Sequence, residues 1–437
     1  MNSGKRLVVI DDDPTGPQAI HDVRVFMDWS VDTLRKAFRT GDSVFFICTN
    51  SRSLSPDEAV KISLEAGKNL QEAAKMEKVE VILTSRSDST LRGHFPTELD
   101  ALISGLGVRP DGIILIPAFF EGGRYTVDDI HYAEQNGQTI PVHLTEFARD
   151  PAYSYKNSDL KKWVEEKTSG SVKAEDVRSI SLEMLRTGGP EAVTGELLKA
   201  SGMTVFIVNA ACYEDLEILA LGITEAEENG KSFAYRCSAS FIKARGGFED
   251  KPLLTHEELA PGMAPGLVIA GSYVDKTSRQ LKQLLDSGIA EGIELLVETL
   301  GQEESADKVI QTTTDYVNQL LAEGKNAVIY TSREIQTEPD RDFSETGKRI
   351  MQSLCRIVRN IDLKPGFIIA KGGITSIELA KTALNAEEAF AIGQILPGVP
   401  VWRLLENAKW TDIPYVVFPG NVGDDEALLK AVKTLLG

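Results

Sequence analysis

The segment LVVIDDDPTG, residues 7–16, joins a short apolar run directly to three aspartates. Its first four residues are all aliphatic, and Pro14 and Gly16 supply turn chemistry just beyond them, so the segment predicts a buried strand. Short apolar runs followed by polar residues recur at three further places, residues 44–53, 81–93 and 113–124. Because helical patterns separate these runs, together they predict a parallel sheet.

The polar residues that follow these strands are expected to meet at one edge of the sheet. Ligands of parallel α/β sheets bind outside the carboxyl ends of the strands. Carboxylates, hydroxyls and arginines gather there, in a mixture suited to a small, polar, anionic molecule. They come from DDDPTG (11–16), TNSRS (49–53), TSRSDSTLRG (84–93) and PAFFEGGR (117–124).

The composition limits the classes of partner. The chain has 437 residues, 42% of them hydrophobic and 26% charged, which is typical of a soluble protein of two or three domains. Its net charge of −18 disfavours nucleic-acid or anionic-membrane binding. An anionic substrate remains compatible, because a few arginines can reverse the field inside a cleft. Without a signal-peptide pattern or a long apolar window, we expect a cytoplasmic protein, and the sequence leaves a homodimer open.

The cysteines and histidines do not form a metal-binding pattern. Cys48, Cys212, Cys237 and Cys355 are isolated in the sequence, and three of them adjoin apolar or aromatic runs typical of small core residues. The five histidines include no pair four residues apart on a helix. A transition-metal site is therefore not expected, and no metal ligands are assigned.

The chain divides into two predicted α/β domains, residues 1–255 and 256–437. Prolines and glycines cluster in 246–266, which is typical of a connection, and the alternation of strands and helices resumes beyond it. Each domain is expected to be a mainly parallel sheet flanked by helices. Residues 122–155 lack clear periodicity and predict a long loop, a feature that is often functional.

Three glycine-containing turns in the second domain also follow predicted strands. They are Gly271-Ser272, KGGITS (371–376) and PGNVGD (419–424). Glycines there let backbone N–H groups approach an oxyanion, as in phosphate-binding turns. Simple tight turns are the alternative interpretation, and Thr375 with Glu378 also fits a capping box. No P-loop motif occurs and no G-x-G-x-x-G follows a predicted strand, which excludes a P-loop protein and disfavours a nicotinamide or flavin enzyme.

The aspartate cluster admits an interpretation as a phosphatase. Asp11-x-Asp13-x-Thr15 fits D-x-D-x-T, the nucleophile motif of Mg²⁺-dependent haloacid-dehalogenase-like phosphatases. Asp11 would attack phosphorus, and Asp424 and Asp425 could supply late metal ligands. Asp424, however, is expected at a helix start, where an acidic residue is common. This interpretation also gives no role to three arginines, Arg52, Arg86 and Arg92.

Six segments, in this order, resemble the four-carbon acid-sugar kinases. They are Asp12-Asp13-x-Thr15-Gly16, TNSR (49–52), DSTLRG (88–93), PAF (117–119) with Gly123-Arg124, GG-x-TS (372–376) and GN-x-G (420–423). The resemblance covers nearly the whole chain, and TNSR and DSTLRG are its most specific parts. It implies a kinase of carbohydrate metabolism that uses ATP and Mg²⁺ to phosphorylate the terminal hydroxyl of threonate, erythronate or 3-oxo-tetronate. It also implies that the N-terminal domain binds the sugar acid and the C-terminal domain the nucleotide, with the active site in the inter-domain cleft.

The resemblance assigns roles to single residues as well. Substrate contacts fall on Asp13, Arg52, Arg86, Asp88 and Ser89, and nucleotide contacts on Ser272, Gly372, Gly373, Thr375 and Gly420. Neighbouring motif positions complete the two predicted sites, Asp12 and Arg92 in the first and Ile374, Asn421 and Gly423 in the second.

The chemistry of these side chains suggests a division of labour. Arginine suits a carboxylate because its planar fork binds both oxygens, so Arg52 and Arg86, followed by Arg92, are the candidates for the acid group. Asp13 or Asp88 would accept the hydroxyl proton as the oxygen attacks the γ-phosphate. Three positions depart from the commoner family pattern, Pro14, Tyr273 and Ile374. The isoleucine replaces a usual glutamate and keeps open a third interpretation, a non-catalytic protein that binds nucleotide and sugar acid.

Overall fold

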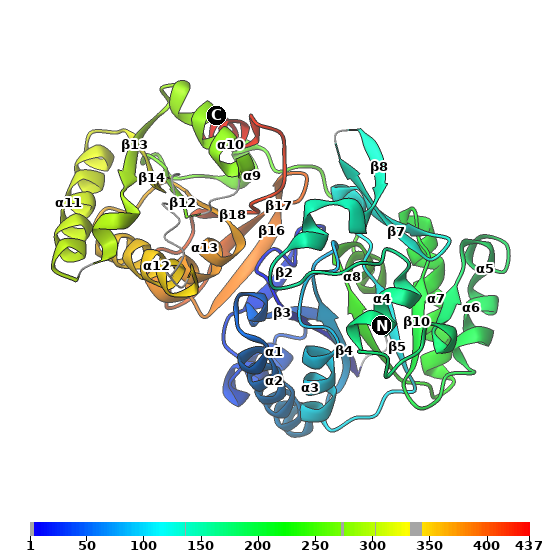
Figure 1. The fold of residues 1–437 in the computed structure, drawn as a ribbon. Helices are drawn as coiled ribbons and strands as arrows, with labels where there is room; N and C mark the ends of the chain where they lie inside the picture. The colour runs from blue at the N-terminus through cyan, green and yellow to red at the C-terminus, as the bar shows by residue number, and fades with distance from the viewer. Residues whose placement is uncertain (1–3, 136, 272–274, 302, 333–342) are drawn as a thin grey trace. The chain divides into compact units, whose positions relative to one another are not determined.

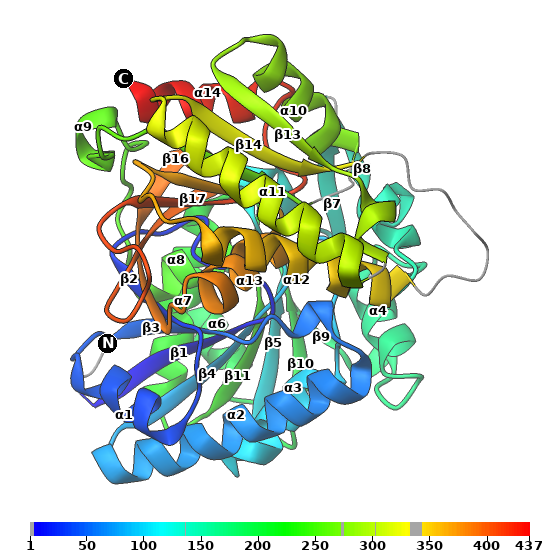
Figure 2. The same cartoon turned by 90° about the vertical axis from the view of Figure 1, so that its left-hand side faces the viewer.

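The computed structural model describes residues 4–135, 137–271, 275–301, 303–332 and 343–437 (Figures 1 and 2). The chain forms two compact units, Met1–Asp250 and Lys251–Gly437. The predicted fold class is confirmed, since each unit contains a mainly parallel sheet with flanking helices. In the described residues, no helix is long and apolar enough to cross a membrane.

The strands of the first unit follow the order β2-β3-β1-β4-β11-β5-β10-β9, and each of these neighbouring pairs is parallel. Their bounds are β1 Lys5–Asp11, β2 Val23–Phe26, β3 Val44–Cys48, β4 Glu80–Arg86, β5 Gly112–Ile116, β9 Arg178–Ile180, β10 Thr204–Val208 and β11 Phe233–Cys237. In the register, Asp11 at the end of β1 pairs with Cys48 on one side and Arg86 on the other. Three of the predicted polar clusters therefore begin side by side.

Helices cover both faces of this sheet, with α1, α2 and α3 on one side and α6 and α7 on the other (Figure 1). Their bounds are α1 Val31–Arg39, α2 Pro56–Glu77, α3 Thr97–Leu106, α4 Leu160–Lys167, α5 Leu182–Arg186, α6 Gly189–Leu197, α7 Tyr213–Glu228 and α8 Ala239–Gly246. Helix α2 begins with proline, and its N-cap Ser55 forms a capping box with Glu58. Helices α2 and α3 lie side by side (Figure 2), where a Cβ at Gly67 would lie only 2.7 Å from the Leu102 carbonyl oxygen.

The predicted loop at 122–155 is partly wrong, because it contains a small antiparallel sheet. Its strands are β6 Arg124–Val127, β7 Ile130–Gln135 and β8 Gln138–Pro141, followed by the 3-10 turns Val142–Leu144 and Glu146–Arg149. The strands have four to six residues and mix polar with aromatic side chains, so they give little periodicity.

The second unit has the strand order β13-β14-β12-β15-β18-β17-β16, parallel from β13 to β18 and antiparallel from β18 to β16. Its strands are β12 Leu267–Ala270, β13 Ala290–Leu295, β14 Asn326–Thr331, β15 Ile368–Lys371, β16 Glu388–Leu396, β17 Val399–Leu404 and β18 Pro414–Phe418. Its helices are α9 His256–Leu259, α10 Asp275–Asp286, α11 Glu303–Ala322, α12 Phe343–Asn360, α13 Gly373–Glu378 and α14 Ala427–Leu436.

Three strands of the second unit were not predicted, and each has a physical reason. Strand β13 lies at the edge of this sheet, and its sequence AEGIEL has two acids and no regular alternation of apolar and polar residues. Strand β17 contains Pro400, which argues against a strand when only the sequence is known. Strand β16 contains alanines and a glycine, so its sequence shows no clear alternation of apolar and polar residues.

Candidate active site

The carboxyl edge of the first sheet brings the predicted substrate residues together. The loops after β1, β3 and β4 are tied to one another by backbone hydrogen bonds, because the Asp12 amide donates to the Arg86 carbonyl (3.3 Å) and the Arg52 amide donates to the Asp12 carbonyl (3.2 Å). Side chains from three separate sequence motifs therefore share one cluster.

The innermost ion pair joins Asp11 and Arg86. Their atoms Oδ1 and Nη1 lie 3.0 Å apart, and the two side chains are 0% and 2% exposed. Burial raises the pKa of Asp11 to about 7, against the opposing effect of Arg86. A Cβ on Gly16 would lie 1.5 Å from Asp11 Oδ2, so the loop closes over this carboxylate. A phosphatase nucleophile must reach phosphorus, and the enclosed Asp11 carboxylate has no room to do so.

Arg52 connects three carboxylates. It contacts Asp12 Oδ1 at 2.5 Å, Asp13 Oδ2 at 3.7 Å and Asp88 Oδ1 at 3.9 Å. Although burial alone would raise the pKa of Asp12, Arg52 holds it below its ordinary value. The side chains of Arg52 and Asp13 remain 16% and 17% exposed, so this part of the cluster is open to a ligand.

The DSTLRG loop is organised around Asp88. Arg92 Nε donates to Asp88 Oδ2 at 2.7 Å, and the Thr90 hydroxyl donates to the same oxygen. Although burial acts in the opposite direction, Arg92 and Arg52 hold the pKa of Asp88 well below its usual range. The loop also needs Gly93, because its φ is +124° and a Cβ there would lie 2.7 Å from Ser87 Oγ.

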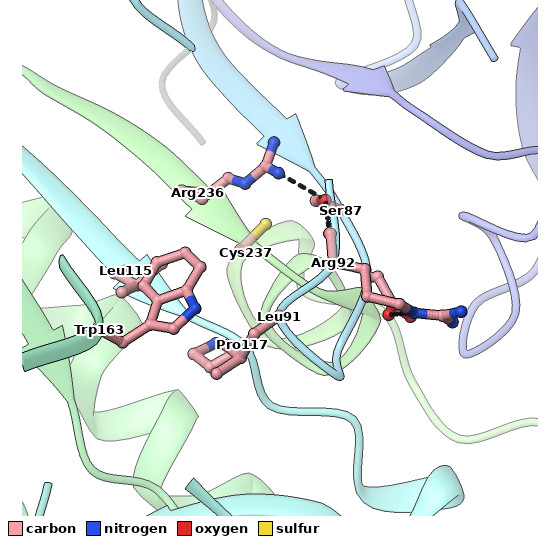
Figure 3. Close-up of a pocket in the computed structure, with 9 residues that line it drawn as sticks. Ser87, Leu91, Arg92, Leu115, Pro117, Trp163, Arg236 and Cys237 are labelled. Atoms are coloured by element: carbon pink, nitrogen blue, oxygen red, sulfur yellow. Dashed lines mark hydrogen bonds and ion pairs between the residues drawn. The ribbon is translucent and has the colours of Figure 1, made fainter. Parts of the chain in front are cut away.

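Sequence reasoning missed two charged residues beneath this loop, Arg236 on β11 and Glu98 on α3. Arg236 Nη1 lies 3.0 Å from Glu98 Oε2, and Arg236 Nη2 donates to Ser87 Oγ at 2.6 Å (Figure 3). Ser87 Oγ in turn lies 2.6 Å from Asp12 Oδ2. The available signal was an arginine inside the apolar run FAYRC, since a buried arginine requires a partner.

A small cavity adjoins these groups. Its volume is about 10 Å³, which is room for roughly one water. Its walls include Ser87, Asp88 and Arg92 on the polar side and Trp163 and Cys237 on the apolar side (Figure 3). Cys237 is a buried free thiol, consistent with the predicted core role.

His131 supports the DSTLRG loop from the small antiparallel sheet. Its Nε2 lies 2.7 Å from the Ser89 carbonyl oxygen and its Nδ1 lies 2.9 Å from Thr126 Oγ1. The ring is fully buried, and burial lowers its pKa to about 4. The neutral ring can donate to Ser89 and accept from Thr126, so it fixes the backbone of a predicted substrate residue.

The shift at His131 predicts a pH dependence of stability. Below pH 6.5, His131 is protonated in the unfolded chain, whereas in the folded protein it stays neutral down to about pH 4. Because the unfolded chain binds more protons in this range, the free energy of unfolding falls as the pH decreases from 6.5 to about 4. The upper limit is about 3 kcal/mol. In urea titrations at pH 7.5 and pH 4.5, His131→Gln should lose less stability on acidification than the wild type. An equal loss in both proteins would contradict this role.

The glycine turns of the second unit meet at the carboxyl edge of its sheet. The register aligns Ala270, Lys371 and Phe418, the last residues of β12, β15 and β18. Gly372 has a φ of +112°, and a Cβ on Gly271 would lie 2.9 Å from Thr375 Oγ1. Lys371 is buried and donates to the Pro419 carbonyl at 2.5 Å, which ties the second turn to the third.

The remaining predicted nucleotide residues lie on or beside these turns. Gly373 and Thr375 are in α13, and Ile374 is 49% exposed. Asn421 accepts a hydrogen bond from Lys276 (3.3 Å), and Gly423 has a φ of +82°. Ser272 and Tyr273 lie outside the described residues, and Gly420 is the second residue of the third turn, directly after Pro419.

Two interpretations from the sequence are corrected here. Thr375 lies inside α13 and Gly372 is its N-cap, so the proposed capping box from Thr375 to Glu378 does not form. Asp424 precedes α14 by three residues and does not start it. Its carboxylate accepts from the Glu426 amide (3.1 Å) and pairs with Lys430 (2.7 Å), which gives Asp424 a local structural role.

The turns fit a phosphate group, because backbone without side chains at Gly372 and Gly373 adjoins the Thr375 hydroxyl. Within the described part of the chain, no three His, Cys, Asp or Glu side chains converge on a metal position. Mg²⁺ at kinase sites is held largely by phosphate oxygens, waters and one or two carboxylates. The donor set therefore fits a metal that arrives together with a nucleotide.

Comparison with known proteins supplies independent information on both units. A family described as a sugar-binding N-terminal domain matches residues 7–245, and one described as a nucleotide-binding C-terminal domain matches residues 267–428. The chain is 24% identical to a D-erythronate kinase of Heliobacterium modesticaldum and 25% identical to a D-threonate kinase of Salmonella typhimurium. Each match covers 98% of this chain and 97% of the relative.

Two solved structures share the fold. A Salmonella typhimurium protein superposes with a TM-score of 0.70 at 18% identity, over 98% of each chain. A Haemophilus influenzae protein superposes with a TM-score of 0.64 at 19% identity, over 98% of this chain and 100% of that one. At these identities the structural likeness supports the architecture alone.

Proposed function

The chain belongs to the four-carbon acid-sugar kinase family, and we propose that it transfers the γ-phosphate of ATP to the terminal hydroxyl of a four-carbon acid sugar. The proposed substrates are of the threonate, erythronate or 3-oxo-tetronate type. The observation that carries this proposal is the partly exposed pair of Asp13 and Arg52 within a cluster of buried ion pairs. The carboxylate of Asp13 can accept the proton that the substrate hydroxyl must lose, and the guanidinium of Arg52 beside it suits a polar anionic substrate.

Asp13 is the better of the two candidate bases. Its Oδ1 accepts from the Thr15 amide and hydroxyl, at 2.9 and 2.5 Å, whereas the nearest partner of Oδ2 among the described residues is Arg52 at 3.7 Å. Asp88 has both oxygens near arginines or Thr90 and stays ionised. We therefore assign proton acceptance to Asp13 and substrate orientation to Asp88, with Ser89 beside it.

The arginines divide into two roles. Arg52 and Arg92, with side chains 16% and 21% exposed, can contact substrate directly. Arg86 is 2% exposed and donates to Asp11, the Asp13 carbonyl and Thr15, so it positions the aspartate loop. Asp12 accepts hydrogen bonds from Arg52 and Ser87, so it links the aspartate loop to the TNSR turn.

ATP supplies the phosphoryl group, and Mg²⁺ neutralises charge on its phosphate oxygens. The residues proposed to hold the nucleotide are those of the three glycine turns, Ser272, Gly372, Gly373, Ile374, Thr375, Gly420, Asn421 and Gly423. Their backbone amides and the Thr375 hydroxyl would donate to phosphate oxygens, a mode that needs no lysine clamp.

The Gly372 turn gives a direct test of nucleotide binding. An alanine at a φ of +112° is strained, because a residue with a Cβ rarely adopts this backbone conformation. We expect Gly372→Ala to raise the KM for ATP at least tenfold while the KM for the acid stays within about twofold. Gly324→Ala is the matched control, because Gly324 has a φ of +77° and a Cβ added there would meet no atom within 4 Å. Equal KM values for ATP in both variants would remove this turn from the nucleotide site.

The function itself is tested by ADP release. Purified protein with MgATP should release ADP in the presence of at least one isomer of threonate, erythronate or 3-oxo-tetronate, well above the rate with ATP alone. ATP binding without turnover on the whole panel would favour the non-catalytic interpretation. Phosphate release from sugar phosphates without ATP would favour a phosphatase.

A further inference from the structure

The arginines around the four aspartates are nearly all neutralised by the protein itself. Arg86 pairs with Asp11, Arg52 with Asp12, and Arg92 with Asp88. Arg236 pairs with Glu98 in the layer below. An incoming carboxylate must compete with these internal partners, so the predicted anion-binding arginines are only partly available.

Arg124, the first residue of β6, differs from all of them. It is 9% exposed, and its Nε is enclosed without a hydrogen-bond partner. Among the described residues, its guanidinium forms no ion pair and no side-chain hydrogen bond. Burial lowers the pKa of Arg124 against the opposing effects of Asp88 and Glu146, so these carboxylates, which form no ion pair with it, do not offset the cost of enclosing the cation. A buried cation of this kind lowers the stability of the folded protein unless a ligand supplies the negative charge.

The surroundings of Arg124 place it beside the DSTLRG loop. Its guanidinium carbon lies 5.9 Å from the centroid of the Phe147 ring, and that of Arg92 lies 5.0 Å from the same centroid. Asp88 acts electrostatically on both arginines. A Cβ at Gly122 would lie 2.2 Å from Arg124 Nη1, so the guanidinium rests directly against a backbone that lacks a side chain.

We propose that Arg124 is a specificity-determining residue that receives the carboxylate of the acid sugar, with Arg92 beside it on the shared Phe147 ring. This inference rests on the proposed function and deepens it. Arg52 links Asp13 to Asp88, Asp88 pairs with Arg92, and Arg92 and Arg124 both lie against the Phe147 ring, so a chain of contacts in the first unit joins the proton acceptor to Arg124. A substrate with a hydroxyl at one end and a carboxylate at the other matches that order, and a neutral polyol does not.

The experiment compares Arg124→Gln, Arg124→Lys and the control Arg149→Gln, an exposed arginine on the same 3-10 turn as Phe147. D-erythronate and D-threonate are the anionic probes, and erythritol and threitol are the neutral ones. Thermal unfolding is measured for each protein without ligand and with each probe at about 10 mM, which would nearly saturate a site with a Kd of about 1 mM. The KM for each acid is then measured with MgATP.

We expect Arg124→Gln to unfold at a temperature no lower than the wild type without ligand, because it removes an unpaired buried charge. Its KM for the acid should rise about 10- to 100-fold, as for the loss of a charge-assisted hydrogen bond. The KM of Arg124→Lys for the acid should lie between those of the wild type and Arg124→Gln, because lysine keeps the positive charge but lacks the planar guanidinium that binds both carboxylate oxygens. Arg149→Gln should match the wild type.

The inference would be overturned if Arg124→Gln unfolded at a lower temperature than the wild type but bound the acids normally. It would also be overturned if the variant lost binding of acids and polyols equally, or if neither acid stabilised the wild type. The proposed function fails separately. If the acids stabilise the wild type but not Arg124→Gln, and no ADP is released, the carboxylate site stands and the kinase assignment falls. If ADP release is normal in Arg124→Gln at all acid concentrations, the kinase assignment stands and this site falls.

Discussion

Replacing Asp13 with asparagine is expected to lower kcat by about 10²- to 10⁴-fold, the usual contribution of a general base. The KM for the acid should change little, because the amide keeps the size of the side chain and can still accept from Thr15. Arg52, which anchors Asp12 and faces Asp13, is untouched by this change. Steady-state kinetics with saturating MgATP measure the effect.

The matched control is Asp32→Asn on α1, whose carboxylate is 96% exposed and pairs only with Arg35 at 3.7 Å among the described residues. It should behave as the wild type. If Asp13→Asn keeps its turnover while Asp88→Asn loses it, proton acceptance belongs to Asp88 and the present assignment is wrong. If both variants turn over normally, the aspartate cluster is not the catalytic centre.

Arg236→Met should cause the largest loss of stability, about 3–5 kcal/mol, because it leaves Glu98 buried without its counter-ion. Arg236 is 5% exposed and Glu98 2% exposed, and the guanidinium also donates to Ser85 and Ser87. The free energy of unfolding is measured from urea titrations. The double variant with Glu98→Gln should recover part of the loss, since the unpaired charge is then gone.

Arg356→Met provides the comparison, because its pair with Asp307 spans 2.7 Å but is 48% and 57% exposed. Exposed pairs contribute about 0–1 kcal/mol, so this variant should unfold close to the wild-type midpoint. A loss at Arg236 no greater than that at Arg356 would show that the buried network does not stabilise the first unit.

The sequence was sufficient to predict the sheet edges that carry the polar clusters. The run from Leu7 to Ile10 has no polar interruption and ends in aspartates, and the structure places Asp11 between Cys48 and Arg86 as a parallel sheet requires. The turns after Ala270, Lys371 and Phe418 meet for the same reason. The hydrophobic periodicity of a strand and the residue types of a turn are local properties, so both can be recognised in a single sequence.

What the sequence could not predict depends on contacts between distant segments. Arg236 and Glu98 are separated by 138 positions, and only the pairing of β11 with β4 and β5 brings the arginine beneath Ser87. The lack of a partner for Arg124 among the described residues is likewise a property of the folded chain, because β6 was not predicted and GGR alone does not show burial. Our proposal that Asp13 rather than Asp88 accepts the proton also required the distances to Arg52, Arg92 and Thr90.

We propose that this chain moves a phosphoryl group from ATP to the hydroxyl end of a four-carbon acid. The most direct measurement is phosphorus NMR of the wild-type protein with MgATP and D-erythronate or D-threonate, followed by the same reaction with Asp13→Asn. We expect ADP and one phosphate monoester whose phosphorus is coupled to the terminal methylene protons, with the ester nearly absent for the variant. ADP accompanied only by inorganic phosphate, or no ester with any four-carbon acid, would contradict it.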